Sequence, residues 1–463
     1  MRLRLNNEGR LASQQTNSSV ADLLRPDVET RTVDEQLVRD RARWPEQIRY
    51  LFENSGFYRD KLTDAGIGTP DAAGALDDLR HLPFTEKDEI RISQAEHPPF
   101  GIHLAADPRS IVRVYSTSGT TGDPVYMPVT AADLAMWIEI SSRSYYAAGL
   151  RPGMKVVSTF NAGPFVAGAS LDTMTKLGVT HIPVGTGNTA RLVRALQLIK
   201  ADALLCTPSY AAYLAEHLLK IGIAPDSLGL KRICVAGEPG GGETEFRGRI
   251  ERAFGATMCE AMGIGDVSVS LWGECDAQQG MHFSGRDFVH VELIDPETGQ
   301  PKPMEDGAEG ELVYTALRRE AVPLLRFRSR DHVRMWVSPC SCGRKTPRVR
   351  CIGRTDELLI VRAVNVFPSA IRDVVAGFAP RVSGAILIRP TVKGVRQEPP
   401  LPVQVELGEG EADDGALAAA IAAKVREVLI ATIKVELVPA GSLGRSEYKT
   451  KLLDFTDAAE APR

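Results

Sequence analysis

Short apolar segments alternate with helix-like segments through the middle of the chain, and this alternation limits the possible folds more than any other feature. The apolar segments have the length and composition of buried strands, and they occupy residues 154–160, 181–185, 203–207, 232–237 and 257–263. Residues 190–200 and 209–221, which lie between them, are expected to be helices. Because this order is typical of parallel strands joined by helical crossovers, the sequence predicts an α/β fold with a largely parallel sheet covered by helices.

The segments before this region are predicted to be helical or loosely ordered. Residues 1–35 are polar and are expected to be poorly ordered. Residues 34–65 have helical periodicity that ends at Gly66. Thr85 is the expected N-cap of the next helix, because charged residues that favour a first helical turn follow it.

The segments after this region predict a second, smaller domain. Strands and turns follow one another across residues 286–352, which indicates a β-rich subdomain. A small α+β region follows, with a helix at 415–430 and a strand at 434–439. A chain of 463 residues is too long for one compact core. We therefore expect a large N-terminal domain, residues 1–353, and a small C-terminal domain, residues 354–463.

Composition excludes several classes of partner. The net charge of −4 provides no basic field for nucleic acid or for an anionic membrane. No apolar run is long enough to cross a bilayer, and the N-terminus lacks the apolar segment of a secretory signal. Seven cysteines at uneven spacing argue against a disulfide framework and favour a reducing compartment. A cytoplasmic location is therefore expected.

The segment YSTSGTTGDP, at residues 115–124, has the composition of a phosphate-binding loop. Its hydroxyls can donate to phosphate oxygens, and its glycines let backbone N–H groups approach an anion. Its candidate ligands are Ser116, Thr117, Ser118, Gly119, Thr120, Thr121 and Gly122. It is not a Walker A loop, because no Gly-Lys-Ser/Thr follows. The alternative is a solvated turn, which this dense combination of residues disfavours.

Several segments in the same order resemble the phenylacetate–CoA ligase family of the adenylate-forming superfamily. The phosphate loop resembles that of the superfamily, which includes acyl-CoA ligases, adenylation domains and luciferases. The segments most similar to the family are LPFTEKDEI (82–90), PVGTGNTARLVRALQLIKADALLCTPSYAAYLAE (183–216) and GRTDELLIVRAVNVFPSAI (353–371). The resemblance extends from about residue 40 to residue 455.

The resemblance implies a reaction in two steps and its cofactors. A carboxylic acid attacks ATP to give acyl-AMP and pyrophosphate, and the thiol of CoA then displaces AMP. Both steps concentrate negative charge, so cations, oriented N–H groups and Mg²⁺ are expected. The small C-terminal domain is expected to act as a mobile lid, and the family also implies a homodimer.

The resemblance assigns roles to charged residues in the second half of the chain. Lys449 matches the lysine of a C-terminal RSE-K motif and is the expected adenylation lysine, with Lys451 as the alternative. Asp331 matches the aspartate that holds the ribose hydroxyls. Arg354 is expected to contact phosphate or ribose, and Asp356 to be the pivot of the lid. The alternative for these residues is a surface ion-pair network.

Two further segments match the family with some departures. Gly237, Glu238 and Pro239 resemble the adenine-side loop. Residues 260–268 match a Tyr-Gly-x-x-Glu motif, of which Gly263 is the glycine. Met262 stands where the family has an aromatic residue on adenine, and Asp266 stands where a glutamate binds Mg²⁺. The remaining departures are Asp123, where the family has lysine, and Ala363, where it has glycine.

Three cysteines and one histidine form a candidate metal site. Cys275 and His282 lie close together in sequence, and Cys340 and Cys342 form a Cys-x-Cys-Gly turn. Four such ligands would complete a tetrahedral zinc site with no open position for catalysis, so a structural zinc is expected. Some members of the resembled family have cysteines and a histidine at these places. Buried thiols with a surface histidine are the alternative, and Cys351 is a reserve ligand.

The segment after the strand at 154–160 is a candidate acyl pocket. In the resembled family this region lines that pocket, and here it mixes small residues with aromatic ones. The candidates are Phe160, Gly163, Phe165, Ala167, Gly168 and Tyr210. Such a pocket suits a flat aromatic acid of the phenylacetate or benzoate type, although a buried core segment is an equal alternative for any one residue.

Three functions are consistent with these features. An AMP-forming ligase that joins an aryl acid to CoA is the first. The second is a stand-alone adenylating enzyme that passes the acyl group to a carrier-protein thiol or an amine. The third, suggested by Met262 and Asp123, is a nucleotide- or acyl-binding protein without turnover.

Overall fold

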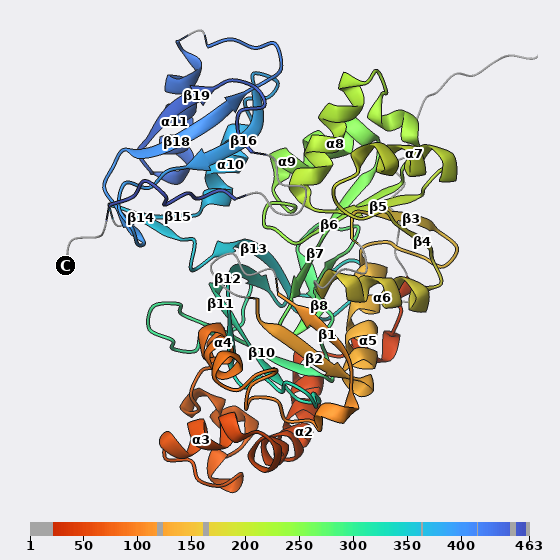
Figure 1. Ribbon diagram of the computed structural model, residues 1–463, viewed down its shortest axis with the longest axis vertical. Helices are drawn as coiled ribbons and strands as arrows, with labels where there is room; N and C mark the ends of the chain where they lie inside the picture. The colour runs from red at the N-terminus through yellow and green to blue at the C-terminus, as the bar shows by residue number, and fades with distance from the viewer. Residues whose placement is uncertain are drawn as a thin grey trace, which may run out of the picture.

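The computed structural model describes most of the chain, and one large sheet organises it (Figure 1). The described residues are 22–117, 124–160, 166–362, 364–413, 415–444 and 451–459. Among them, eleven strands form a mixed sheet in the order β10-β11-β12-β13-β9-β8-β7-β6-β5-β3-β4. None of the helices in these ranges is long and apolar enough to cross a membrane.

One half of the sheet is parallel and carries the predicted strands. These are β3 (Lys155–Ser158), β4 (Thr180–Pro183), β5 (Ala203–Cys206), β6 (Arg232–Ala236) and β7 (Thr257–Ile264), all hydrogen-bonded in parallel. The helices that cover them are α6 (Ser170–Leu177), α7 (Thr189–Ile199), α8 (Pro208–Lys220) and α9 (Thr244–Phe254). Separate apolar clusters fill the two faces, one around Leu204 and the other around Leu205. The predicted α/β fold is confirmed here.

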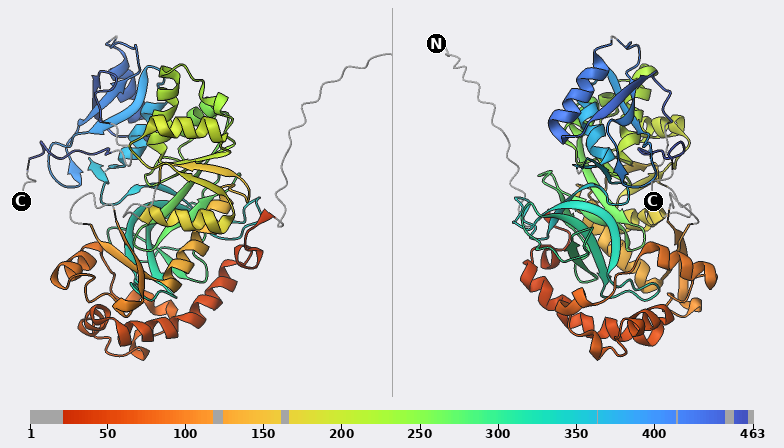
Figure 2. Two further views of the ribbon diagram at one scale, coloured as in Figure 1. Left: turned by 45° about the vertical axis from the view of Figure 1, so that its right-hand side comes forward. Right: turned by 90° about the vertical axis from the view of Figure 1, so that its left-hand side faces the viewer.

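The other half of the sheet is antiparallel and strongly curved (Figure 2). It consists of β8 (Ser268–Glu274), β9 (Met281–Phe283), β10 (Val289–Ile294), β11 (Glu309–Ala316), β12 (Phe327–Trp336) and β13 (Arg348–Arg354). Because β13 pairs with β9, the β-rich stretch expected at 286–352 continues the main sheet instead of forming its own. The hairpin of β1 (Ile111–Ser116) and β2 (Tyr126–Thr130) and helix α5 (Ala131–Ala147) pack on this half, where Trp137 is fully buried.

The N-terminal helices differ from the predictions in three details. Helices α1 (Pro26–Glu29) and α2 (Val33–Asn54) lie partly within residues 1–35, so the expected loose order does not extend to residues 22–35. The helical stretch predicted at 34–65 is two helices, because Ser55 ends α2 and caps α3 (Gly56–Asp64). Thr85 is not a helix cap. Glu86 precedes α4 (Lys87–Glu96), and the buried Thr85 hydroxyl donates to the Leu325 carbonyl at 2.6 Å.

The C-terminal residues form a separate lobe with its own core (Figure 1). Its described strands form two three-stranded sheets, β15-β14-β17 and β16-β18-β19. Its elements are β14 (Leu359–Val361), β15 (Val364–Val366), α10 (Pro368–Ala376), β16 (Val382–Ile388), β17 (Arg396–Gln397), β18 (Leu401–Leu407), α11 (Leu417–Leu429) and β19 (Ile433–Val438). The predicted helix and strand at 415–430 and 434–439 are α11 and β19. Helix α10 packs against α9 and brings the lobe over the parallel half of the sheet.

Candidate active site

The carboxyl ends of β5, β6 and β7 meet beneath the C-terminal lobe, where ligands bind in open α/β sheets. The turn at residues 237–242 follows β6 at this edge. Gly237 and Gly240 have φ values of +101° and +106°, which side chains other than glycine rarely adopt. The Glu238 carboxylate accepts a hydrogen bond of 2.6 Å from the Ser209 backbone N–H at the start of α8. The predicted residues Gly237, Glu238 and Pro239 therefore lie in one fixed turn at this edge.

The end of β7 brings Met262 and Gly263 to the same edge. Met262 is half-buried, and Gly263 is exposed. A Cβ at Gly263 would collide with the backbone carbonyl of Val269, so this position tolerates only glycine without a backbone shift. The predicted Mg²⁺ ligand, Asp266, is buried, and its carboxylate accepts from the Lys87 ammonium at 2.9 Å. Sequence reasoning did not identify Lys87, which is separated from Asp266 by 179 positions.

Strand pairing and hydrogen bonds bring three of the predicted charged residues together. Asp331 of β12 lies opposite Arg354 of β13, and an oxygen of Asp331 is 3.5 Å from the Arg354 guanidinium. Arg354 also donates two hydrogen bonds to Asp356, of 2.8 and 2.9 Å. Burial lowers the pKa of Arg354, but the Asp331 and Asp356 carboxylates outweigh it and raise the pKa above its ordinary value. The guanidinium therefore stays charged at the point where the main chain enters the C-terminal lobe.

Several predicted residues lie outside the described part of the chain. These are Ser118, Gly119, Thr120, Thr121 and Gly122 of the phosphate loop, Gly163 and Phe165 of the acyl segment, the departures Asp123 and Ala363, and Lys449. The described start of the phosphate loop is Ser116 and Thr117. Both are buried at the end of β1, and the Thr117 N–H donates to the Val125 carbonyl at 3.0 Å.

The structure does not bring all the candidate acyl residues together. Phe160 packs in the apolar cluster around Leu205, with Ala167 beside it and Gly168 nearby in the 3₁₀ turn Val166–Ala169. Tyr210 packs in the cluster on the opposite face of the sheet. Its hydroxyl donates to the Thr189 hydroxyl at 3.0 Å. Phe160 and Tyr210 therefore lie in different apolar clusters, and their roles in an acyl pocket stay predictions.

Glu260 of β7 is a buried carboxyl that the sequence did not single out. It packs against the turn at residues 237–242, and a Cβ at Gly242 would lie 2.8 Å from one of its oxygens. Burial, followed by the charge of Glu274, raises the pKa of Glu260 to about 7. Glu274 itself is paired with Arg247 at 2.5 Å. The pair of adjacent glycines at 241–242 was the available sequence signal, because adjacent glycines can admit a bulky neighbour.

Replacing Glu260 by glutamine should stabilise the protein at alkaline pH. The unfolded carboxyl loses its proton near pH 4.5, whereas the folded one keeps it to about pH 7. The native state therefore loses stability as pH rises through this window, by about 3 kcal/mol in total. We expect Glu260→Gln to raise the melting temperature at pH 8 and to leave it nearly unchanged at pH 5.

Glu274→Gln is the matched control for this substitution, because it removes a buried carboxylate that has an arginine partner. It should lower the melting temperature at both pH values. A Glu260→Gln variant whose stability follows the wild-type pH profile would contradict the shifted pKa.

Four side chains form a compact cluster away from this edge. The ligand atoms of Cys275, His282, Cys340 and Cys342 all lie within 4.8 Å of one another, and all four residues are buried. The sulfurs of Cys275 and Cys340 are 3.7 Å apart, and the Cys342 sulfur is 3.4 Å from His282 Nε2. The other ring nitrogen of His282 is 3.1 Å from the Thr346 hydroxyl, which fixes the ring. The two pairs from the sequence therefore meet, and Cys351 lies outside the cluster.

Comparison with known proteins identifies the family. The family model for AMP-binding enzymes matches residues 61–316, and the model for the C-terminal domain of AMP-binding enzymes matches residues 363–454. The chain belongs to the AMP-binding enzyme family. The first match covers the strands of the large sheet from β3 to β11, and the second covers most of the C-terminal lobe.

Relatives of this AMP-binding enzyme include phenylacetate-coenzyme A ligases. The phenylacetate-coenzyme A ligase of Thermus thermophilus is 34% identical over 445 residues, which cover 92% of this chain and 97% of that protein. The chain is therefore an AMP-forming acid–CoA ligase, as the sequence resemblance predicted.

The arrangement of the two lobes can be compared with that in solved structures of a related ligase. The 2-hydroxyisobutyryl-CoA ligase in the postadenylation state, with 2-HIB-AMP, has a TM-score of 0.86 at 28% identity, covering 97% of this chain and 94% of that chain. The same ligase in the thioesterification state, with 2-HIB-AMP and CoA, has a TM-score of 0.67 at 29% identity, covering 93% and 91%. The lobes of this AMP-binding enzyme are therefore arranged more like those of the postadenylation state.

Proposed function

We propose that this AMP-binding enzyme activates an aromatic carboxylic acid with ATP and transfers the acyl group to CoA. The observation that carries the proposal is the contact of Arg354 with both Asp331 and Asp356 at the start of the C-terminal lobe, within a chain that matches a phenylacetate-coenzyme A ligase along nearly its whole length. Arg354 lies between the Asp331 and Asp356 carboxylates where the two lobes join. A cation there can contact the phosphate or ribose of a nucleotide while the C-terminal lobe moves.

Each predicted residue has a role in this proposal. Asp331 accepts hydrogen bonds from the ribose hydroxyls, and Arg354 contacts ribose or phosphate. Asp356 is the pivot between the large domain, residues 1–353, and the lid, residues 354–463. Lys449 neutralises charge between the carboxylate and the α-phosphate, and residues 116–122 receive the β- and γ-phosphates.

Mg²⁺ would use Asp266 as its protein ligand. Mg²⁺ at such sites takes one or two carboxylates together with substrate phosphates and water, and Asp266 offers a hard oxygen of this kind. The Lys87 ammonium, 2.9 Å from that carboxylate, has to give up this contact when the ion binds. When bound, Mg²⁺ would supply positive charge to the polyphosphate.

We also propose a structural zinc at the cysteine–histidine cluster. A tetrahedral ion with Zn–S distances of about 2.3 Å separates its sulfurs by about 3.8 Å. The spacing of 3.7 Å between the Cys275 and Cys340 sulfurs fits this geometry. The contact of His282 with Thr346 is of the kind that orients a metal-bound imidazole. Three cysteines and one histidine leave no open position, so the ion would have a structural role.

The proposed substrate is an aromatic acid, and one observation favours a small aliphatic hydroxy acid as a second candidate. A close structural neighbour is a ligase whose name specifies 2-hydroxyisobutyryl, a small aliphatic hydroxy acid. Phe160, which belongs to the apolar cluster against which Ala167 packs, supports an aryl acid, because aromatic rings pack favourably against one another. The cytoplasmic location and the homodimer remain predictions.

Pyrophosphate release tests the proposed function. The enzyme is incubated with ATP, Mg²⁺ and one acid from a panel of phenylacetates, benzoates and 2-hydroxyisobutyrate, with and without CoA. We expect an aryl acid to give release that rises strongly with CoA, together with AMP and a thioester. Release that depends on the acid but not on CoA would identify the adenylating enzyme that serves a carrier protein or an amine. Release with 2-hydroxyisobutyrate alone would contradict the aromatic substrate.

A further inference from the structure

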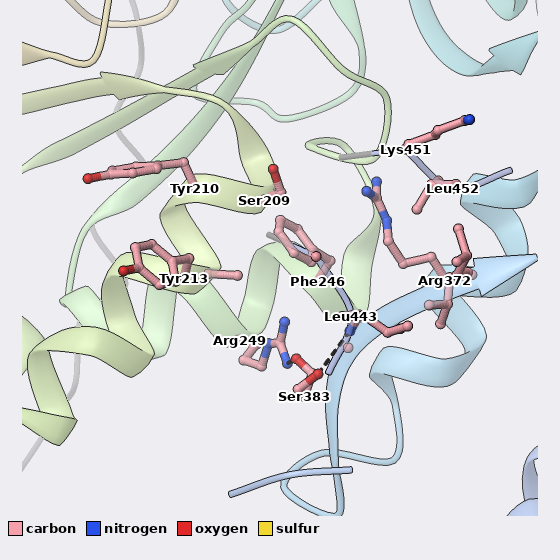
Figure 3. Close-up of a pocket in the computed structure, with 16 residues that line it drawn as sticks. Ser209, Tyr210, Tyr213, Phe246, Arg249, Arg372, Ser383, Leu443, Lys451 and Leu452 are labelled. Carbon is pink, nitrogen blue, oxygen red and sulfur yellow. Dashed lines mark hydrogen bonds between the residues drawn. The ribbon is translucent and has the colours of Figure 1, made fainter. Parts of the chain in front are cut away.

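The two lobes meet around a cavity. The cavity has a volume of about 160 Å³ and lies between helices α8 and α9 of the large domain and strand β16 of the C-terminal lobe (Figure 3). Its walls include Tyr213, Phe246 and Leu452. Contacts that cross the interface beside this cavity help to hold the two lobes in this arrangement.

Two arginines cross this interface in opposite directions. Arg372 of helix α10 is only 7% exposed, and its guanidinium donates to the Pro239 carbonyl of the large domain. Arg249 of helix α9 donates to the Ser383 carbonyl of the C-terminal lobe at 3.1 Å. The buried ring of Phe246 lies between them, with its centroid 5.6 Å from the Arg249 guanidinium carbon and 5.8 Å from that of Arg372 (Figure 3). Both charges therefore face one aromatic ring.

Each arginine enters the space left by a glycine of the opposite lobe. Gly240 has a φ of +106°, and a Cβ there would collide with the Arg372 guanidinium. Gly384 has a φ of +87°, and a Cβ there would lie 3.0 Å from an Arg249 nitrogen. Arg372 therefore occupies the inside of the turn at residues 237–242, and a larger residue at Gly240 would expel it.

The turn that Arg372 holds is also the proposed nucleotide turn. Pro239, which accepts from Arg372, directly follows Glu238, which accepts from the Ser209 N–H at 2.6 Å. The large domain thus fixes one side of the turn, and the C-terminal lobe fixes the other. Glu243 and Asp373 flank Arg372, and their charges partly balance the charge of this buried cation.

We propose that Arg372 is a positioning residue for acyl-AMP formation, which it supports by fixing the turn at residues 237–242 only while the C-terminal lobe is closed. The inference rests on the proposed function and adds a direct link between lobe position and the nucleotide turn. When the lobe rotates for the thioester step, α10 leaves α9 and Arg372 leaves Pro239, so the turn relaxes. The contact therefore serves the first half-reaction and is absent from the second.

Separate assays of the two half-reactions test this role. Pyrophosphate formation in the first turnover measures the adenylation step. Thioester formation from CoA and a synthetic acyl-AMP measures the second step. We expect Arg372→Ala to slow the first at least tenfold, as for loss of a charged hydrogen bond, and to change the second less than twofold. Arg372→Lys, which keeps the charge, should recover part of the first rate.

Two further variants accompany this test. Gly240→Ala should also slow the first step, because its Cβ displaces Arg372 and its φ of +106° strains the turn that this step uses. Arg426→Ala, on the exposed surface of α11 in the same lobe, should leave both steps unchanged. Equal losses in both half-reactions, or an unaffected first step in Arg372→Ala, would overturn the proposal.

A wild-type enzyme that releases no pyrophosphate with any acid would overturn the proposed function and not the role of Arg372 alone.

Small-angle scattering provides a second measurement, which reports how far apart the two lobes lie and does not depend on activity. Arg372→Ala should give a larger radius of gyration than wild type in the presence of AMP, because the lobes part more readily. Identical scattering curves would overturn the role of Arg372.

Discussion

Lys449→Ala should reduce the rate of acyl-AMP formation by about 10³-fold, while nucleotide affinity changes little. The attack of a carboxylate on the α-phosphate brings two anionic groups together, and an ammonium that lies between them stabilises the transition state more than the bound nucleotide. The loss should therefore appear in the rate constant of the first turnover and not in the dissociation constant of ATP. Rapid-quench measurement of acyl-AMP, combined with calorimetric binding of ATP, separates the two quantities.

Lys451 provides the control for this substitution. It was the alternative candidate, and its side chain is 75% exposed with its ammonium 3.8 Å from Asp454. We expect Lys451→Ala to retain most of the adenylation rate, because an exposed ion pair of this kind contributes little. Full adenylation activity in Lys449→Ala would exclude the assignment, and a selective loss in Lys451→Ala would transfer the role to Lys451.

Removal of the metal should have the second large effect. We expect one zinc ion per chain in the purified protein and none in a Cys342→Ser variant. Without the ion, three buried thiols and one buried imidazole lose their common partner, and the folded state should lose several kcal/mol, enough to lower the melting temperature by about 10 °C. Metal analysis by mass spectrometry and thermal unfolding with and without a chelator measure both quantities.

Cys351→Ser is the matched control for the metal site. Cys351 is buried like the cluster residues, but it lies outside the cluster, and its sulfur contacts the Gly353 carbonyl at 3.7 Å. The variant should keep its zinc. A wild-type protein that contains no zinc, or a Cys342→Ser variant that retains it, would leave the cluster as a group of buried thiols.

Local patterns in the sequence predicted the parts of the fold that depend on neighbouring residues. The parallel strands and helices α7, α8 and α11 follow from apolar periodicity, which acts over a few residues. Thr85 shows the limit of this reasoning, because its hydroxyl bonds to Leu325, 240 positions away, and is thereby withdrawn from any capping role. The break at Ser55 was missed because both helices share the same charged periodicity.

Residues of the candidate site that lie in local sequence motifs could be predicted. Contacts between segments that are distant in sequence could not. The cysteine pairs were visible in the sequence, although only the fold brings them together. The contacts of Lys87 with Asp266 and of Arg372 with Pro239 join positions 179 and 133 residues apart, and neither has a local signal. The sequence also did not show that Tyr210 and Phe160 pack in different apolar clusters, because proximity to a strand end does not specify a face of the sheet.

The position of the metal cluster along β13 has a mechanical consequence. Cys340 and Cys342 precede this strand, its first residue pairs with His282, and its last residue is Arg354. Strand β13 therefore joins the cluster at one end to the start of the C-terminal lobe at the other. In the proposed rotation of the lobe about Asp356, a firmly held β13 would confine the bending to the few residues around Asp356. A loosely held β13 would spread the same rotation along the strand, and the two positions of the lobe would be less well defined.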